Sequence, residues 1–248
     1  MSSQILVKGN TLSEADTTCW LPLAIPRHRS YVLDNWYIPS GSEERRATFC
    51  TQSMTKRAMD VLLALLGLVL LSPFMLILAA AIMVDSLGSP VYRTYRVGKN
   101  GRLFRFYKFR TMVNDAHLML DQVSDLNERD QVLFKVAQDP RLTRLGRLLR
   151  RFSLDELPQF WNVLRGDMSM VGPRPPMPAE YEQFLPEHRR RMDVLPGLTG
   201  LWQVEARRDQ SFETYVRLDC HYVDNWSLLL DLRILLKTIP AVLSRTGE

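Results

Sequence analysis

Two adjacent carboxylates, Asp155 and Glu156, lie in a part of the sequence that is otherwise rich in arginine. Residues 139–175 read DPRLTRLGRLLRRFSLDELPQFWNVLRGDMSMVGPRP, and Arg174 follows the acids between a Gly-Pro pair and another proline. Cations around an acidic pair suit a site where a phosphate group meets a carboxylate, because phosphoryl transfer depends on positioning and on neutralised charge. Four arginines recur at every third position before the acids: Arg141, Arg144, Arg147 and Arg150.

The sequence around the acids predicts two short helices, at 141–152 and 157–164. The first is amphipathic, and its arginines fan across about half of its surface. They form either a solvated basic face or a face at the level of lipid headgroups. Ser153 and Glu156 have the spacing of a capping box, but Pro158 would then fall inside the helix and remove a hydrogen bond. We therefore expect Asp155 to cap the second helix.

A single long apolar segment precedes these motifs. Residues 61–84 read VLLALLGLVLLSPFMLILAAAIMV, which is 24 residues (84 − 61 + 1) without a charge. A straight helix of that length would be about 36 Å long, enough to cross a hydrocarbon core of about 30 Å. Pro73 at its centre favours a kink, and Ser72 can bond a carbonyl that the proline leaves free.

The charges on both sides of this segment favour a helix that enters the membrane, breaks at Ser72 and Pro73, and returns. Basic residues are enriched on the cytoplasmic side of membrane segments. A re-entrant segment keeps both flanks on that side, whereas a spanning helix, the alternative, would translocate one of them. The basic residues are Arg45, Arg46, Lys56 and Arg57 before the segment and Arg93, Arg96, Lys99, Arg102 and Arg105 after it.

Composition narrows the class of protein. A chain of 248 residues predicts one domain or at most two, and a net charge of +5 suits anionic partners. The spacing of Cys19, Cys50 and Cys220 fits neither a disulfide framework nor a zinc site, which favours a reducing cytoplasm. No nucleic acid is expected as a partner, because that function would need exposed aromatics among the basic residues and no membrane segment. The N-terminus lacks the pattern of a signal peptide.

Further elements follow from hydrophobic periodicity and turn residues. The elements are a β-hairpin at 91–107, a helix and a loop at 114–137, a loop at 172–178, a turn at 196–200, and helices at 179–192, 212–223 and 227–242.

Asp231 lies in the apolar run LLLDLRILL of the last of these helices. It is interpreted equally well as a functional carboxylate or as a helix-surface residue.

From Lys56 to the C-terminus the sequence resembles the bacterial sugar transferase family, the monotopic phosphoglycosyl transferases. The resemblance rests on YKFRTM, on residues 139–175 and on RLDCHYV. It implies an α+β, mainly helical fold, with a re-entrant membrane hairpin at 56–86, a small β-hairpin and amphipathic interfacial helices around a cytoplasmic catalytic domain at 87–248. Residues 1–55 are expected to be an irregular N-terminal extension, to which we assign no function.

The resemblance also implies an activity and its location. Family members transfer a sugar-1-phosphate from a UDP-sugar to undecaprenyl phosphate at the cytoplasmic leaflet of the bacterial inner membrane. This step initiates the assembly of an exopolysaccharide, a capsule or another glycoconjugate. The sequence leaves open whether the sugar is glucose, galactose or an N-acetylated hexosamine, and whether the protein is a homo-oligomer.

Particular residues take roles from the same resemblance. Asp155 would be the nucleophile that forms an aspartyl-phosphosugar with release of UMP, and would also bind Mg²⁺. Glu156 would either orient the metal or act as a base. Two departures from the family pattern concern the substrate pocket: Thr94 replaces a common glutamine, and Glu205 with Ala206 replaces a common small residue and glycine. Substrate binding is assigned to Lys108, Arg150, Arg174, Arg207, Asp219 and Tyr222.

A second class of function also fits the composition. A non-catalytic adaptor at the membrane surface could bind acidic lipids through an Arg-rich face. Such a protein has no need of acids inside its cationic cluster, so Asp155 and Glu156 favour the enzyme.

Overall fold

The computed structural model describes residues 5–7, 10–12, 43–119, 123, 136, 139–207, 209 and 211–244. Within this part of the chain helices predominate and the strands pair as three two-stranded sheets, so the mainly helical α+β class is confirmed. The α-helices are α2 (Glu43–Asp85), α4 (Arg144–Arg151), α5 (Gln159–Arg165), α6 (Pro178–Glu182), α7 (Leu201–Glu205), α8 (Phe212–Asp224) and α9 (Leu228–Leu243). The strands are β1 (Ile5–Val7), β2 (Asn10–Leu12), β3 (Val91–Val97), β4 (Leu103–Phe109), β5 (Ser169–Val171) and β6 (Gly197–Thr199). The 3₁₀ helices are η2 (Lys99–Gly101), η3 (Ala116–Met119), η5 (Leu154–Glu156) and η6 (Pro186–Asp193).

The predicted β-hairpin is confirmed as β3 and β4, which pair antiparallel along their whole lengths. Asn100 (φ 56°) and Gly101 (φ 74°) adopt left-handed conformations in the turn between them. Phe104 and Phe106 of β4 enter the main apolar core, while Lys108 lies near the end of the strand. The hairpin therefore carries Lys108 on a regular, packed element rather than on a loop.

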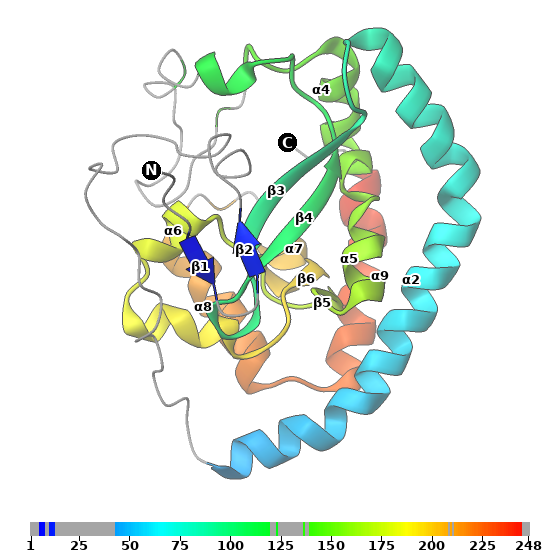
Figure 1. The fold of residues 1–248 in the computed structure, drawn as a ribbon. Coiled ribbons are helices and arrows are strands. Elements are labelled where there is room, and N and C mark those ends of the chain that lie inside the picture. The colour runs from blue at the N-terminus through cyan, green and yellow to red at the C-terminus, as the bar shows by residue number, and fades with distance from the viewer. Residues whose placement is uncertain are drawn as a thin grey trace.

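Helix α2 continues through Pro73 and curves along one side of the molecule (Figure 1). The predicted break at Ser72 and Pro73 is therefore not a break in the helix. A proline at this position deprives the carbonyl of Val69, four residues earlier, of its helical donor. The Ser72 hydroxyl donates to that oxygen at 3.0 Å, which explains how the helix continues. Over Met54–Asp85 it is long and apolar enough to cross a membrane.

The N-terminal part of α2 is fixed to the domain by charged side chains. The guanidinium of Arg57 donates to the carbonyl oxygens of Val163 and Leu164 at 2.6 and 2.7 Å. These carbonyls lie in the last turn of α5, where a cation is favourable. Asp60 is 1% exposed. It accepts hydrogen bonds from the Ser169 hydroxyl at 3.0 Å and from the backbone N–H of Met170 at 2.9 Å.

A buried polar network joins α2 to α9. The ammonium of Lys56 forms a 2.6 Å ion pair with Asp231, which is fully buried. Asp231 also accepts from the Tyr222 hydroxyl at 2.7 Å and from the Trp226 indole N–H at 3.1 Å. Lys56 and Tyr222 both donate to the carbonyl oxygen of Val171, each at 3.0 Å. The interpretation of Asp231 as a helix-surface residue is therefore wrong.

The C-terminal part of α2 packs on the same domain. Leu78 and Ile82 join Phe109 of β4 and Leu149 of α4 in an apolar cluster. The guanidinium of Arg110 donates to the carbonyl oxygens of Ser86 and Leu87, the two residues that follow the helix. One domain thus holds both ends of α2.

Several predicted elements differ in the structure. The helix predicted at 141–152 begins later, because the Thr143 hydroxyl caps it by accepting from Gly146 N–H at 2.9 Å. Arg141 therefore lies outside the helix, in a buried 2.6 Å ion pair with Asp139. The helix predicted at 179–192 is divided into α6 and η6, because Pro186 cannot continue a helix. The turn predicted at 196–200 contains β6, which pairs parallel with β5.

Two predicted segments fall largely outside the described residues. Of residues 1–55, the structure describes β1, β2 and the start of α2, which begins at Glu43 rather than near residue 56. Of residues 114–137 it describes little beyond η3. The helices predicted at 212–223 and 227–242 are confirmed as α8 and α9.

Candidate active site

Close docking of α4 on the residues after β4 carries Arg150 into the site. A Cβ atom at Gly146 would lie 1.9 Å from the carbonyl oxygen of Thr111, so this approach requires glycine. The backbone N–H of Thr143 donates to the same oxygen at 3.1 Å. Nε of Arg150 donates to the Thr111 hydroxyl at 3.1 Å. Burial lowers the pKa of Arg150, and the negative charge of Asp155 opposes that shift, so the guanidinium lies within electrostatic range of this acid.

The acidic pair lies in η5, a single turn between α4 and α5. Ser153, just before it, adopts a left-handed conformation (φ 54°), which is uncommon for a residue with a side chain and clusters at functional sites. Helix α5 begins only at Gln159, with Pro158 as its N-cap residue, so the prediction that Asp155 caps this helix is wrong. Asp155 is 7% exposed, and within the described residues its carboxylate has no hydrogen-bonded partner.

The structure brings the acids together with the predicted cations. Burial, and after it the negative charge of Asp155, raises the pKa of Glu156. The positive charges of Arg174, Arg207 and Lys108 act in the opposite direction. With Arg150, these residues form a group of two acids and four cations, which we call the catalytic cluster after the role predicted for Asp155.

Lys108 is the most perturbed cation of this cluster. Burial, followed by the positive charge of Arg150, lowers the pKa of Lys108 to about 8, while Asp155 acts to raise it. Its ammonium lies 5.4 Å from the ring centroid of Tyr92. A lysine with this pKa is mostly protonated at neutral pH and loses its charge under mildly alkaline conditions.

The backbone of Arg174 is held by a buried cluster from η6 and α8, which we call the Arg174 clamp: Arg191, Tyr215 and Asp219. The carbonyl oxygen of Arg174 accepts from the Arg191 guanidinium at 2.9 Å and from the Tyr215 hydroxyl at 3.3 Å. The Arg174 N–H donates to the Asp219 carboxylate, which is also ion-paired with Arg191. Because both polar backbone groups of Arg174 are bonded, the clamp fixes the direction in which its side chain leaves the loop.

Within the clamp, burial and the charge of Arg191 shift the pKa of Asp219 in opposite directions. The Arg191 guanidinium carbon lies 4.0 Å from the ring centroid of Tyr215, and the Arg191 side chain is fully buried. Burial raises the pKa of Asp219 to about 6, although the charge of Arg191 acts to lower it. Sequence reasoning missed Arg191, because it ends a run of three arginines at 189–191, a pattern typical of a solvated surface.

Asp219 and Tyr222, both predicted to bind substrate, are each 1% exposed. Asp219 belongs to the Arg174 clamp, and Tyr222 bonds the Val171 carbonyl and Asp231. Through these contacts both residues stabilise the segment from Val171 to Arg174. The assignment of these two residues to substrate binding stays a prediction.

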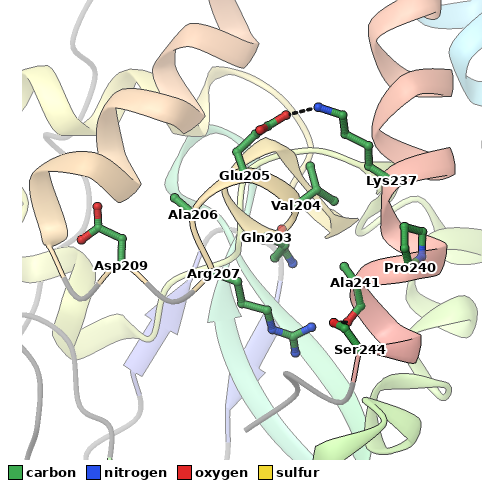
Figure 2. A pocket seen from close by; sticks show the side chains of 10 residues that line it. All are labelled: Gln203, Val204, Glu205, Ala206, Arg207, Asp209, Lys237, Pro240, Ala241 and Ser244. Carbon is green, nitrogen blue, oxygen red and sulfur yellow. Dashed lines mark hydrogen bonds and ion pairs between the residues drawn. The ribbon is translucent and has the colours of Figure 1, made fainter.

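Arg207 links the catalytic cluster to an open groove. Its guanidinium donates to the Ser153 hydroxyl at 3.0 Å, two residues before Asp155. The groove has a volume of about 690 Å³ and lies between the end of α7 and the C-terminal half of α9 (Figure 2). Its lining residues are Gln203, Val204, Glu205, Ala206, Arg207, Asp209, Lys237, Pro240, Ala241 and Ser244.

The acidic pair fits a divalent cation that shares its ligands with a substrate. The described residues hold no group of three or more histidine, cysteine or acidic side chains that would enclose a metal by themselves. Mg²⁺ is commonly bound through one or two carboxylates together with substrate phosphates. Asp155 and Glu156 supply two carboxylates. Burial, and after it the charge of Asp155, raises the pKa of Glu156, and a cation would relieve the repulsion between the two acids.

Buried acids among cations, in a domain that carries a long apolar helix, are an arrangement that suits phosphate chemistry at a membrane. The family described as Bacterial sugar transferase matches residues 51–245. The chain therefore belongs to the bacterial sugar transferase family and is an enzyme of the transferase class.

Three relatives illustrate the similarity. The Exopolysaccharide production protein ExoY of Sinorhizobium fredii is 45% identical over 199 residues, which cover 79% of this chain and 88% of the relative. The Galactosyl transferase CpsE of Streptococcus agalactiae is 42% identical over 195 residues, covering 78% of this chain and 43% of the relative. The Undecaprenyl-phosphate galactose phosphotransferase of Salmonella typhimurium is 42% identical over 199 residues, covering 77% and 41%. The chain thus spans less than half of the two longer relatives and most of the shorter one.

Proposed function

We propose that this enzyme transfers a sugar-1-phosphate from a UDP-sugar to undecaprenyl phosphate and so initiates the assembly of an exopolysaccharide or capsule. The observation that carries the proposal is Asp155, a carboxylate without a hydrogen-bonded partner among the described residues, within electrostatic range of Arg150 and Lys108. The names of the relatives, which include exopolysaccharide production and undecaprenyl-phosphate galactose phosphotransferase, support it. An adaptor that binds lipid through basic residues would not need this acid.

In the first half-reaction a carboxylate oxygen of Asp155 attacks the phosphorus that bears the sugar. A new bond forms between this oxygen and phosphorus, and the bond from phosphorus to the bridging oxygen of the diphosphate breaks. UMP leaves with the electron pair of that bond. The product on the protein is a sugar phosphate joined to Asp155 as an acyl phosphate.

In the second half-reaction a phosphate oxygen of the lipid attacks the same phosphorus. The bond between phosphorus and Asp155 breaks, so the carboxylate is regenerated and the sugar becomes joined to the lipid through a diphosphate. No electron donor or acceptor is needed. Dividing the transfer in this way lets one set of cations serve both attacks.

The cations of the cluster neutralise the phosphates in both steps. The backbone of Arg174 is fixed by the clamp, and its planar guanidinium suits two parallel bonds to a phosphate. Arg150 and Lys108 add positive charge close to Asp155, where charge develops during the transfer. Glu156, whose pKa is raised, either holds a proton as an acid or base or helps to orient a metal.

Asp155 would also bind Mg²⁺, and Glu156, if it does not act as an acid or base, would help to orient the ion. The ion would supply charge neutralisation for the diphosphate of the donor.

We further propose that α2 is re-entrant and that the catalytic domain lies at the cytoplasmic face of the membrane. Lys56, Arg57 and Asp60 at one end of the helix and the residues after its other end all bond the same domain. If α2 crossed the bilayer, these polar contacts would draw a charged domain into the hydrocarbon, at a high cost in free energy. The curvature of α2 (Figure 1) and the bond at Ser72 are compatible with a helix that dips into one leaflet.

A labelling experiment tests the nucleophile. The purified protein in detergent, given Mg²⁺ and a UDP-sugar carrying a labelled sugar, should release UMP and become labelled before any lipid is added. UDP-galactose is the first donor to test, because two of the relatives are named for galactose. Asp155→Asn should abolish both signals, whereas Glu213→Gln, which changes an exposed carboxylate on α8, should leave them unchanged. Persistent labelling of Asp155→Asn would identify a different nucleophile.

A cysteine-accessibility experiment tests the topology. Lys8→Cys and Lys99→Cys, each in a chain without its native cysteines, place a thiol on either side of the apolar segment. Both thiols should resist a membrane-impermeant reagent in intact cells and react after lysis. Modification of one of the two in intact cells would instead support a spanning helix.

A further inference from the structure

The groove between α7 and α9 has two chemically different ends. In Figure 2 the exposed ion pair of Glu205 with Lys237, 2.5 Å long, lies at one end and Arg207 at the other. Apolar side chains contribute to both walls between them: Val204 and Ala206 on the α7 side, Pro240 and Ala241 on α9. Gln203, Asp209 and Ser244 add polar groups to the lining. The groove can therefore hold a ligand whose apolar part contacts these four apolar residues and whose anionic end meets Arg207.

The anionic end would lie beside the catalytic cluster. Arg207 reaches out of the groove to bond Ser153, and its positive charge acts on Glu156. A phosphate bound to Arg207 would therefore lie next to the acidic pair. From Arg207 the groove extends toward the ion pair of Glu205 with Lys237 (Figure 2), so the rest of the ligand would lie along that direction.

The apolar body is better matched by a hydrocarbon chain than by a nucleobase. None of the ten residues that line the groove is aromatic, so the groove offers no ring on which a base could stack. On α9 the lining positions 237, 240 and 241 adjoin exposed apolar side chains, Leu236, Ile239 and Leu243. A lipid chain on that apolar surface would enter the groove past Pro240 and Ala241.

We propose that this groove binds the acceptor lipid, with its phosphate at Arg207 and its first isoprenoid units along Val204, Ala206, Pro240 and Ala241. The inference rests on the proposed function, because it names the site for the second substrate of that reaction. In the second half-reaction the phosphate held by Arg207 supplies the attacking oxygen. Lipid binding and nucleotide binding then use separate parts of the protein around one phosphorus atom.

Filling the groove tests the proposal, because the two half-reactions can be measured separately. Ala241→Trp places an indole across the groove on α9. We expect UMP release and protein labelling in the absence of lipid to stay within about twofold of the unmodified protein. The KM for a short polyprenyl phosphate should rise at least about tenfold, the effect expected when a well-packed apolar contact is lost. Leu232→Trp adds the same indole to an exposed position of α9 outside the groove and should change neither measurement.

The other outcomes overturn the proposal in distinguishable ways. Loss of labelling without lipid, in a folded Ala241→Trp protein, would show that the groove binds the UDP-sugar. Unchanged kinetics in both half-reactions would show that the groove binds neither substrate. Should Ala241→Trp fail to fold, Ser244→Trp makes the same test at the groove residue that caps the C-terminus of α9. Absence of labelling in the unmodified protein would instead refute the proposed function itself.

Discussion

Asp231 and Asp155 are both buried carboxylates close to cations, yet their surroundings differ in one respect. Asp231 is bonded by Lys56, Tyr222 and Trp226, so both of its oxygens are occupied. Asp155 is 7% exposed and, within the described part of the chain, accepts no hydrogen bond, although its charge interacts with those of Arg150 and Lys108.

The difference separates a structural acid from a reactive one. A carboxylate with every lone pair engaged holds elements together, because removing one partner would leave a buried charge uncompensated. A carboxylate in a positive field without direct bonds keeps an oxygen free to attack phosphorus. The first arrangement fixes α2, α9 and β5 to one another, and the second leaves Asp155, in η5 between α4 and α5, available for the proposed attack.

Exchanging each acid for its amide tests this comparison with the largest expected effect. Asp231→Asn leaves Lys56 without its partner in a site where the lysine side chain is only 13% exposed. The expected loss is about 3 kcal/mol of stability, or a fall of about 6–12 °C in the apparent Tm in detergent. Asp155→Asn should leave the Tm unchanged or raise it, while labelling is lost.

The double variant Lys56→Met with Asp231→Leu is the matched control for Asp231. It removes both charges and replaces them with apolar side chains, so it should recover much of the lost stability. If Asp231→Asn alone had the same Tm as the unmodified protein, this result would contradict a structural role for Asp231.

A weaker effect is expected from the Arg174 clamp, which supports the catalytic cluster without joining it. Asp219→Asn keeps the size of the side chain but weakens its bonds to the Arg174 N–H and to Arg191. A hydrogen bond to a charged group contributes about 1.5–3 kcal/mol, so kcat/KM for the UDP-sugar should fall about 10- to 100-fold. Tyr215→Phe removes one hydroxyl bond at 3.3 Å and should cost less than tenfold.

The kinetic pattern distinguishes positioning from general unfolding. If the clamp orients Arg174, replacement of Arg174 by alanine in an Asp219→Asn background should cost little more than the Arg174→Ala change alone, because the two act through one group. Fully additive losses, or a large fall in Tm in Asp219→Asn, would indicate that the clamp acts through overall stability.

The smallest expected effect is a change in pH dependence at Lys108. The pKa of Lys108 is lowered to about 8, so its positive charge is present below that pH and is lost as the pH rises through it. The kcat/KM for the UDP-sugar, which reports groups of the free enzyme, should therefore fall on the alkaline side near pH 8. Lys108→Arg should move this fall to higher pH, because arginine stays protonated. An unchanged alkaline limb would assign it to another group.

The sequence predicted the β-hairpin and the two C-terminal helices well, because each has a clear local pattern. It also located the acidic pair and its cations, since their residue types and spacing are local properties. It predicted that the Ser72 hydroxyl could bond a carbonyl freed by Pro73, but it did not predict that the helix continues through this position. It also failed at Arg141, where a threonine cap starts α4 later than the periodicity suggests.

Other features had no local signal. Arg191 reads as one of three surface arginines, but the fold buries it between Tyr215 and Asp219. The partnership of Lys56 with Asp231 joins residues 175 positions apart, and no periodicity reports such a distance. The same holds for the groove, whose walls come from α7 and α9.

By itself, the sequence determined which chemistry the protein carries: an apolar segment, a carboxylate pair and a surplus of arginine, all set by residue type and short spacing. Only the tertiary structure decided that Asp231 is fully hydrogen-bonded while, among the described residues, Asp155 accepts no hydrogen bond. It also decided that Arg191 holds the backbone of Arg174 and that the groove between α7 and α9 reaches Arg207. The physical reason is that hydrogen bonds, burial and electrostatic shifts depend on distances in space, which long-range packing alone sets.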